Sequence, residues 1–340
     1  MNKKLIAAAV VAGLAAPMAA QADVSVYGVA QLELTNYDDG AATTGIVLDD
    51  KFGQSRVGVR WSEDLGGGLK SLGVFEWGPQ IDSHFAGGSN PALDGRIAYI
   101  GLKGGWGEVD AGTILQPYKY SGGVKYDAFV ATAAQARPTS AAPGAGGGMS
   151  GGAFGHGAYF NDAISYKNKF GMATIWLAYS PEKAATIGTP SGNGASGDLM
   201  ASVVVGFNGG EAGLAYAKDN NASGTTGADG VKNTKIFGKY SFGSSTVLAQ
   251  YEDSKAATSG NKTKYAFLGY QLKMGMNKFV VQLGKTDSDQ ANNAGDYNYM
   301  AVGAIHNMSK KTRVFLAYRN TKTDGSDANK SLSLGLTEKF

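Results

Sequence analysis

The sequence has no cysteine, few prolines and no long hydrophobic run. Its 340 residues include 8 Pro, 3 His and no Cys. Without cysteine there is neither a disulfide framework nor thiolate chemistry. Beyond the N-terminus, no stretch reaches the ~20 apolar residues that a transmembrane helix needs. Any crossing of a membrane must therefore be made by strands.

An excess of charge of one sign is also lacking. Lys and Arg number 31 against 28 Asp and Glu, for a formal net charge of +3. So balanced a chain has no basic stripe of the kind that binds nucleic acid, and we expect no nucleic-acid partner. Glycine is abundant, at 51 residues, but follows no Gly-X-Y period that would indicate collagen.

Groups for catalysis or metal binding are too scattered to form a site. The histidines, His84, His156 and His306, lie far apart, in predicted loops or near predicted turns. A hydrolase needs a histidine within reach of a nucleophile and an orienting acid, and no such set occurs. No pair of residues has the spacing of metal ligands. The sequence predicts no enzyme activity, no metal and no cofactor.

The first 22 residues have the pattern of a secretory signal peptide. A charged start, Asn2-Lys3-Lys4, precedes a short apolar core from Leu5 to Ala16. Ala20-Gln21-Ala22 is a small-x-small cleavage site, so the mature chain is expected to begin at Asp23.

The remainder, 23–340, alternates between apolar and polar residues with period two, which predicts strands with one apolar and one polar face. In the first segment Leu32 and Leu34 oppose Gln31 and Glu33. The predicted strands, about sixteen, are 24–35, 54–62, 69–77, 96–103, 108–115, 164–167, 173–179, 199–207, 212–217, 235–242, 246–252, 264–272, 278–285, 297–306, 313–319 and 331–340.

The connections between these strands alternate in length. Those at 208–210, 243–245 and 275–277 are short, whereas 181–197, 219–233 and 288–295 are long and polar. Short turns at one end and long loops at the other are typical of an outer-membrane barrel. We predict an all-β fold, one transmembrane antiparallel β-barrel of about 16 strands without a domain boundary, because an open sheet edge cannot be left in lipid.

One long segment, about 118–160, shows no strand or helix pattern. Its middle, 132–157, is almost wholly Ala, Gly, Ser and Pro. A long irregular segment within a regular chain is usually either disordered or functional. We predict that it is the third outer loop, folded into the lumen to narrow the pore.

Several short motifs resemble those of the trimeric general porins of the Gram-negative outer membrane. They are Asp23-Val24-Ser25-Val26-Tyr27-Gly28, Ser55-Arg56-Val57-Gly58, Ser62-Glu63-Asp64-Leu65-Gly66, Gly101-Leu102-Lys103-Gly104 with Trp106-Gly107, Ser309-Lys310-Lys311-Thr312 and the terminal Phe340. The resemblance implies a sixteen-stranded barrel that passes repeatedly through the outer membrane, a homotrimer and passive diffusion of small hydrophilic solutes. It also implies outer-membrane lipid, lipopolysaccharide and the barrel-assembly machinery as partners, with Phe340 as the assembly signal.

The same resemblance suggests residues of the pore constriction. Arg56 and Arg96 match basic wall positions, and Arg60 shares a face with Arg56. The resemblance makes Asp127, the segment's one carboxylate before Asp162, the counter-charge of these arginines. Alternatively, Asp127 is a turn carboxylate and the arginines pair with acids elsewhere on the wall.

At two positions the chain departs from the family pattern. Thr113 and Tyr159 stand where relatives often carry further arginines, so we expect only a weak anion preference. The aromatic residues of the segment are predicted either to bind sugars by stacking or to pin the segment to the wall; they are Tyr118, Tyr120, Tyr126 and Phe129.

A general diffusion porin is therefore the leading interpretation. A channel selective for a sugar or an anion, an outer-membrane barrel enzyme and a secreted soluble β protein remain as alternatives.

Overall fold

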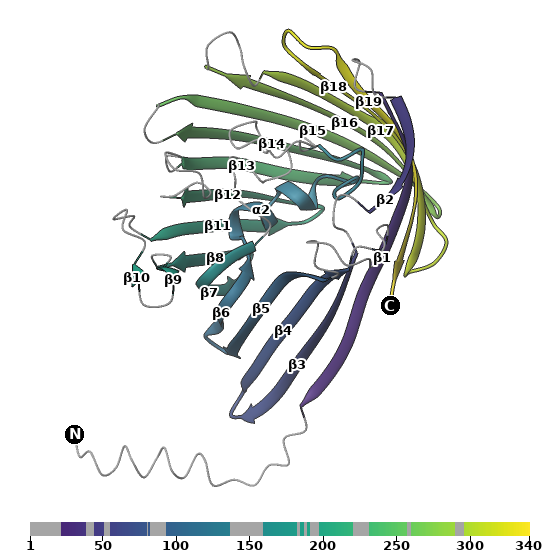
Figure 1. Cartoon of the computed structure of the whole chain (residues 1–340). Coiled ribbons are helices and arrows are strands. Elements are labelled where there is room, and N and C mark those ends of the chain that lie inside the picture. Colours follow the sequence, from purple (N-terminus) through teal and green to yellow (C-terminus); the bar gives the residue numbers. More distant parts are fainter. Residues whose placement is uncertain are drawn as a thin grey trace, which may run out of the picture.

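In the computed structural model, antiparallel strands follow one another around a closed ring (Figure 1). The described residues are 22–38, 44–50, 55–79, 81, 93–136, 159–181, 184–186, 189–190, 197–219, 231–256, 260–289 and 296–340. The main sheet has 17 strands, but β2 and β3 both pair with β1 on the same side and share one position. Sixteen positions therefore surround the barrel, and the predicted fold class is confirmed.

Strand bounds generally extend the predicted segments by a few residues. Three short strands were not predicted: β2 lies between the first two predicted strands, and β9 and β10 lie within the predicted long loop 181–197. The strands are β1 (Asp23–Asp38), β2 (Thr44–Asp49), β3 (Arg56–Gly66), β4 (Leu69–Pro79), β5 (Leu93–Gly104), β6 (Gly107–Leu115), β7 (Tyr159–Phe170), β8 (Ala173–Ser180), β9 (Ala184–Thr186), β10 (Thr189–Pro190), β11 (Asp198–Phe207), β12 (Gly210–Asp219), β13 (Val231–Phe242), β14 (Ser245–Ala256), β15 (Lys262–Met274), β16 (Asn277–Ser288), β17 (Tyr297–Asn307), β18 (Thr312–Thr323) and β19 (Ala328–Lys339).

Two faces with different chemistry explain why this sequence forms a barrel. Along most of β15 and β16 exposed residues alternate with buried or half-buried ones. Leu268 and Leu283 are about half exposed on the outer face, whereas Gln282 is fully buried on the inner face. An apolar outer band suits lipid, and polar inner side chains suit a lumen.

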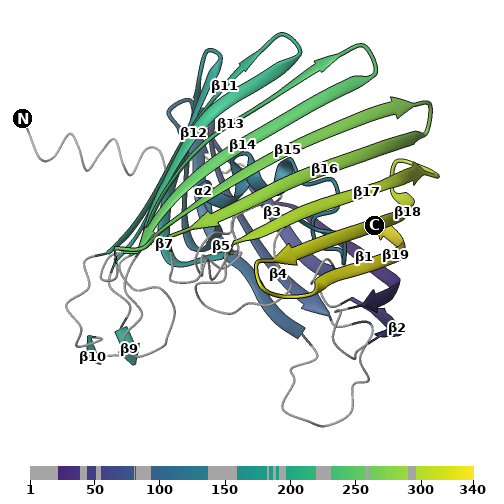
Figure 2. The same cartoon turned by 90° about the horizontal axis from the view of Figure 1, so that it is seen from above.

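The two ends of the barrel differ as predicted. Short turns gather at one end of the strands, while β9 and β10 lie at the other (Figure 2). Gly243 and Gly275, in two of these short turns, have φ of 56° and 60°, which favours glycine. Near the same end Phe207, Tyr240 and Phe242 stack at centroid distances of 6.4 and 6.2 Å, as in an interfacial aromatic girdle. Among the described residues no helix has the length and apolarity to cross a membrane.

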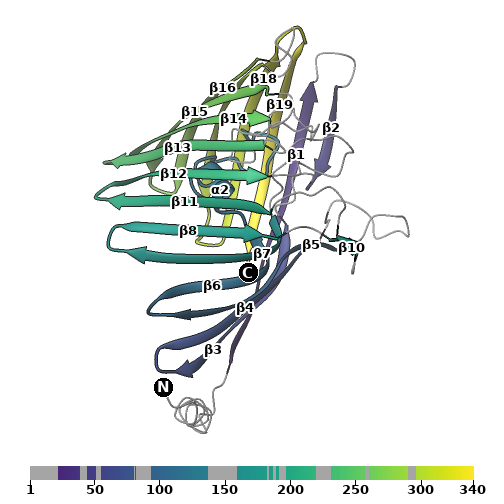
Figure 3. The ribbon, with the colours of Figure 1, turned by 90° about the vertical axis from the view of Figure 1, so that its left-hand side faces the viewer.

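The first and last strands close the ring. β1 and β19 pair from Val29↔Lys339 to Asp38↔Lys330, and they lie side by side in Figure 3. The backbones of Gly28 and Phe340 exchange two hydrogen bonds of 3.1 Å. A Cβ on Gly28 would lie 2.1 Å from the Phe340 ring, so the missing side chain makes room for that ring.

Candidate functional site

The described part of the segment between β6 and β7, residues 116–136, lies inside the ring of strands. It starts with a short helix, α2 (Pro117–Tyr120), and a 3-10 turn, η1 (Gly123–Lys125). Figures 1 and 3 show α2 inside the barrel. The rings of Tyr118, Tyr126 and Phe129 are at most 1% exposed. This favours the pinning role over sugar stacking. Residues 137–158 of the predicted pore loop lie outside the described residues.

A buried polar cluster holds the start of the segment. The Tyr118 hydroxyl donates to Glu252 Oε2 at 2.8 Å, and the Gly123 amide donates to Gln250 Oε1 at 2.6 Å. Lys235 Nζ lies 4.4 Å from the centroid of the Tyr118 ring. Burial raises the pKa of Tyr118, and the charge of Glu252 raises it further, so the phenol remains a donor.

Asp127 organises the next turn of the segment. Its Oδ1 accepts from the Phe129 amide at 2.9 Å and from Gln282 Nε2 at 2.9 Å. Its Oδ2 accepts from the Ala136 amide at 2.8 Å. Gln282 Oε1 also accepts from the Ala128 amide at 2.8 Å. These bonds match the turn-carboxylate alternative, and none of them joins Asp127 to Arg56, Arg60 or Arg96.

The end of the described segment is bonded to β1 across the barrel. Both carboxylate oxygens of Glu33 accept from the Ala133 amide at 3.0 Å. Gln31 Nε2 donates to the Ala131 carbonyl at 2.7 Å. Side chains of the inner wall thus bind backbone groups that would otherwise be buried without partners.

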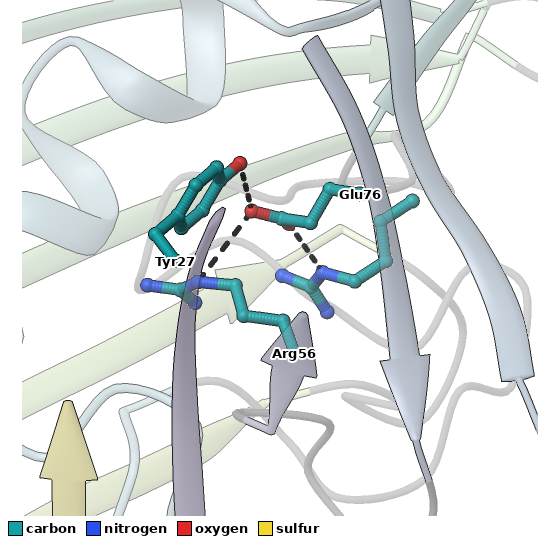
Figure 4. Close-up of polar contacts among 4 residues, drawn as sticks. Tyr27, Arg56 and Glu76 are labelled. Atoms are coloured by element: carbon teal, nitrogen blue, oxygen red, sulfur yellow. Dashed lines mark hydrogen bonds and ion pairs between the residues drawn. The ribbon is translucent and has the colours of Figure 1, made fainter. Parts of the chain in front are cut away.

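Elsewhere on the inner wall, two arginines converge on one carboxylate (Figure 4). Arg96 Nε lies 2.6 Å from Glu76 Oε1, and Arg56 Nε lies 3.6 Å from Glu76 Oε2. The Tyr27 hydroxyl donates to Glu76 Oε2 at 2.9 Å. The Glu76 side chain is 7% exposed, against 27% for Arg56 and 15% for Arg96. Two cations therefore share a single, more deeply buried anion.

The backbone brings these side chains together in two ways. Gly58 lies between Tyr27 and Glu76 in the strand register, and a Cβ on it would lie 2.6 Å from the Tyr27 ring. The missing side chain lets Tyr27 reach across β3. Between β4 and β5 the register shifts, so that Glu76 faces both Arg96 and Ile97. Such a bulge redirects a side chain.

A second register shift, between β6 and β7, lies at Thr113, which lines the same cavity as Arg96. Gly112 pairs with Ala163 and Ile114 with Phe160, which leaves Thr113 facing Asn161 and Asp162. Gly112 has φ of 134°, and a Cβ on it would lie 2.3 Å from the Ala98 carbonyl. Only glycine fits there without strain.

A cavity of ≈ 390 Å³ lies at this place, with Glu76, Arg96, Thr113 and Tyr159 in its lining. The Arg96 guanidinium lies 5.4 Å from the centroid of the Tyr159 ring, within cation–π range. Four predicted site residues, Arg56, Arg96, Thr113 and Tyr159, thus surround or adjoin Glu76.

Arg60 lies beside this group rather than in it. Its Nε donates to Ser25 Oγ at 2.9 Å, and its guanidinium lies 5.3 Å from the centroid of the Tyr27 ring. The structure thus places Arg60 one pleat pair from Arg56 on the same face, as predicted.

Glu76 is the site residue that sequence reasoning missed. It stands between Phe75 and Trp77, whose side chains are 43% and 38% exposed. A carboxylate flanked by two outward-facing aromatic residues must face the lumen, and that alternation was the available signal.

Comparison with known proteins agrees with this architecture. The model of the family described as Gram-negative porin matches residues 7–326. The chain is 30% identical over 340 residues to outer membrane porin protein 32 of Delftia acidovorans, covering 95% of this chain and 90% of that protein. It is 34% identical over 128 residues to the major outer membrane protein P.IB of Neisseria gonorrhoeae. That match spans about a third of each chain, at 36% of this one and 34% of the other.

Among solved structures, the chain resembles an anion-selective porin from Comamonas acidovorans. The TM-score is 0.75 at 23% identity, and the match covers 94% of this chain and 100% of the other. This likeness shows the same fold. Because the family model matches nearly the whole chain, the chain belongs to the Gram-negative porins of the outer membrane.

Proposed function

We propose that the chain forms a water-filled outer-membrane channel through which ions and small hydrophilic solutes diffuse passively, with a weak preference for anions. The observation that carries the preference is the shared carboxylate of Arg56 and Arg96. Among the residues that the structure describes, Arg60 lies beside Arg56 and Arg96, and Glu76 is the carboxylate that pairs with the latter two. The comparison with an anion-selective porin of the same fold supports the sign.

Physical reasoning links these charges to selectivity. Charges that line a passage with low-dielectric walls focus their field and raise the concentration of counter-ions. Basic side chains around a pore favour anions. Glu76 cancels part of the positive charge, and at 0.15 M salt the field decays over ~8 Å. The preference should therefore be weak and should grow as the ionic strength falls.

Zero-current potentials in a KCl gradient across a planar bilayer test this assignment. The unmodified channel should favour chloride, and the double substitution R56S/R96S should abolish or reverse the preference, because it leaves Glu76 uncompensated. Lys103 to Gln, which removes a cation paired with Glu108 at 2.9 Å near a short turn, is the matched control. A cation preference in the unmodified protein, or no shift in the double variant, contradicts the assignment.

The cavity beside Arg96 favours a second candidate, a channel that binds a preferred solute. Its lining combines Glu76, Arg96 and Thr113 with the ring of Tyr159. Binding there would make a solute block the ion current in a saturable manner at low concentration. Block that rises only in proportion to concentration would leave general diffusion as the function.

We further propose that residues 1–22 are removed, that 23–340 form the barrel with 118–160 as its pore loop, and that three copies assemble. β1 begins at Asp23, directly after the predicted cleavage site. Val24, Val26 and Ile46 are more than 60% exposed on the first strands, an apolar face suited to lipid or to another copy. Native mass spectrometry of the outer-membrane protein should give three times the mass of a chain beginning at Asp23. A retained leader, or a monomer only, argues against the corresponding proposal.

We also propose that the chain is not an enzyme, since its inner wall serves to bind the segment and to line the passage. Lipid hydrolysis by the purified protein would contradict this.

A further inference from the structure

A second group of inward-facing cations lies near the short turns, on a different part of the wall from Arg56 and Arg96. Lys273 and Lys278 flank the turn between β15 and β16, and Arg313 stands at the start of β18. Each lies an even number of residues from a buried residue of its own strand, and so on the same inner face. The pairs are Lys273 with Phe267, Lys278 with Val280, and Arg313 with Phe315. All three side chains therefore face the lumen near its short-turn mouth.

The register places like charges next to one another. Lys273 and Lys278 are direct cross-strand partners in the antiparallel pair β15–β16. Side chains so placed have Cβ atoms about 4.5–5.5 Å apart, and like charges there repel. Arg313 and Lys273 both act on Lys278 with a charge of the same sign. This cluster therefore costs free energy when nothing is bound to it.

Two other lysines near the same mouth are paired with carboxylates. Lys239 lies 3.2 Å from Glu211, and Lys103 lies 2.9 Å from Glu108. Within the described part of the chain, Lys273, Lys278 and Arg313 make no ion pair with a carboxylate. Lys273, Lys278 and Arg313 therefore differ from Lys239 and Lys103.

Among the described residues, the Arg313 side chain makes one hydrogen bond and keeps its other donors available. Its Nε donates to Thr337 Oγ1 at 3.3 Å, which fixes the plane of the guanidinium. Between Arg313 and Lys278 runs β17, whose Asn307 pairs with Arg313 in the register. A guanidinium can bind an oxyanion with two parallel hydrogen bonds, and two ammonium groups can add further donors.

From this arrangement we infer that Lys273, Lys278 and Arg313 form an anion-binding site at the short-turn mouth, for free oxyanions with two or more negative charges. A divalent anion offsets the repulsion among all three cations at once, whereas chloride offsets less of it. The inference requires a water-filled lumen but not that Arg56 and Arg96 set its selectivity. On this view multivalent anions dwell at the periplasmic side of the pore.

Sulfate, which stays divalent at neutral pH, is the probe. Added at constant ionic strength to the short-turn side of a bilayer-inserted channel, it should reduce the chloride current in a saturable manner, and at lower concentration than from the other side. K273Q/K278Q should require at least tenfold more sulfate for the same reduction. K239Q, which removes a paired lysine, should behave as the unmodified channel.

Heat-modifiable electrophoretic mobility establishes that each variant is folded, and R313Q provides a second route to the same loss if the double variant fails to fold. Block that does not saturate, equal block in K273Q/K278Q and the unmodified channel, or the same loss in K239Q would overturn the site. Zero-current potentials in KCl alone report on Arg56 and Arg96, so failure of the sulfate test is distinguishable from failure of the proposed selectivity.

Discussion

At the scale of single residues, the position of one carboxylate determines how much positive charge Arg56 and Arg96 present to the lumen. Glu76 is 7% exposed and lies against Arg56 and Arg96, so their positive charge reaches the lumen partly neutralised. Tyr27 adds a hydrogen bond to the same carboxylate. The arginines alone would suggest a stronger field than this arrangement produces.

Changing Glu76 to Gln should make the channel more selective for anions. One charge ~8 Å from an ion in water is worth about 0.5 kcal/mol, or about a twofold change in the local concentration of each ion before screening. The zero-current potential in a KCl gradient measures the change. Glu108 to Gln is the control, because Glu108 pairs with the more exposed Lys103. An unchanged potential in E76Q would mean that the ions do not pass near this group.

At the scale of elements, the strands were predictable and the binding of the inner segment was not. Period-two alternation within each strand is local, so sixteen strands could be predicted without knowing their partners. The irregular segment could also be located from local sequence, because it has no strand or helix pattern and its middle is almost wholly Ala, Gly, Ser and Pro. Its wall contacts could not, because Gln282 lies 155 residues from Asp127 and no local pattern links them. The bulge that turns Arg96 toward Glu76 is likewise visible only once β4 and β5 are paired.

Replacing Asp127 by Ala should loosen the segment while leaving the barrel intact. The substitution removes acceptors from Phe129, Ala136 and Gln282, each hydrogen bond contributing about 1 kcal/mol net. Hydrogen exchange of amides 128–136 should quicken, and the open-channel current should become noisier. Asp127 to Asn keeps one oxygen and should give a smaller effect. Exchange at the unmodified rate in D127A would show that the other wall contacts suffice.

At the scale of the whole molecule, the barrel depends on a seam between the two ends of the mature chain. Phe340 lies across Gly28, and the two backbones exchange hydrogen bonds. Until this seam forms, β1 and β19 are exposed edges, which cannot be left unpaired in lipid.

Deleting Phe340, or changing Gly28 to Val, should lower the yield of folded barrel without altering the conductance of the channels that form. The Val side chain would occupy the place of the Phe340 ring, so combining both changes should add little to either alone. Gly45 to Val is the control, since a Cβ there meets no atom within 4 Å. Heat-modifiable mobility gives the yield, and normal yield in both single variants would refute a role for this contact.

The pairing of β1 with β19 has a consequence for how the cell handles this chain. β1, the first strand to be synthesised, cannot complete its pairing until the last strand has been made, because its partner comprises residues 330–339. Nothing in between can seal the wall, so a chain that stops early keeps an open edge however well its other hairpins form. Closure of the barrel therefore requires both ends of the mature chain, and a truncated chain that lacks β19 keeps the edge of β1 unpaired.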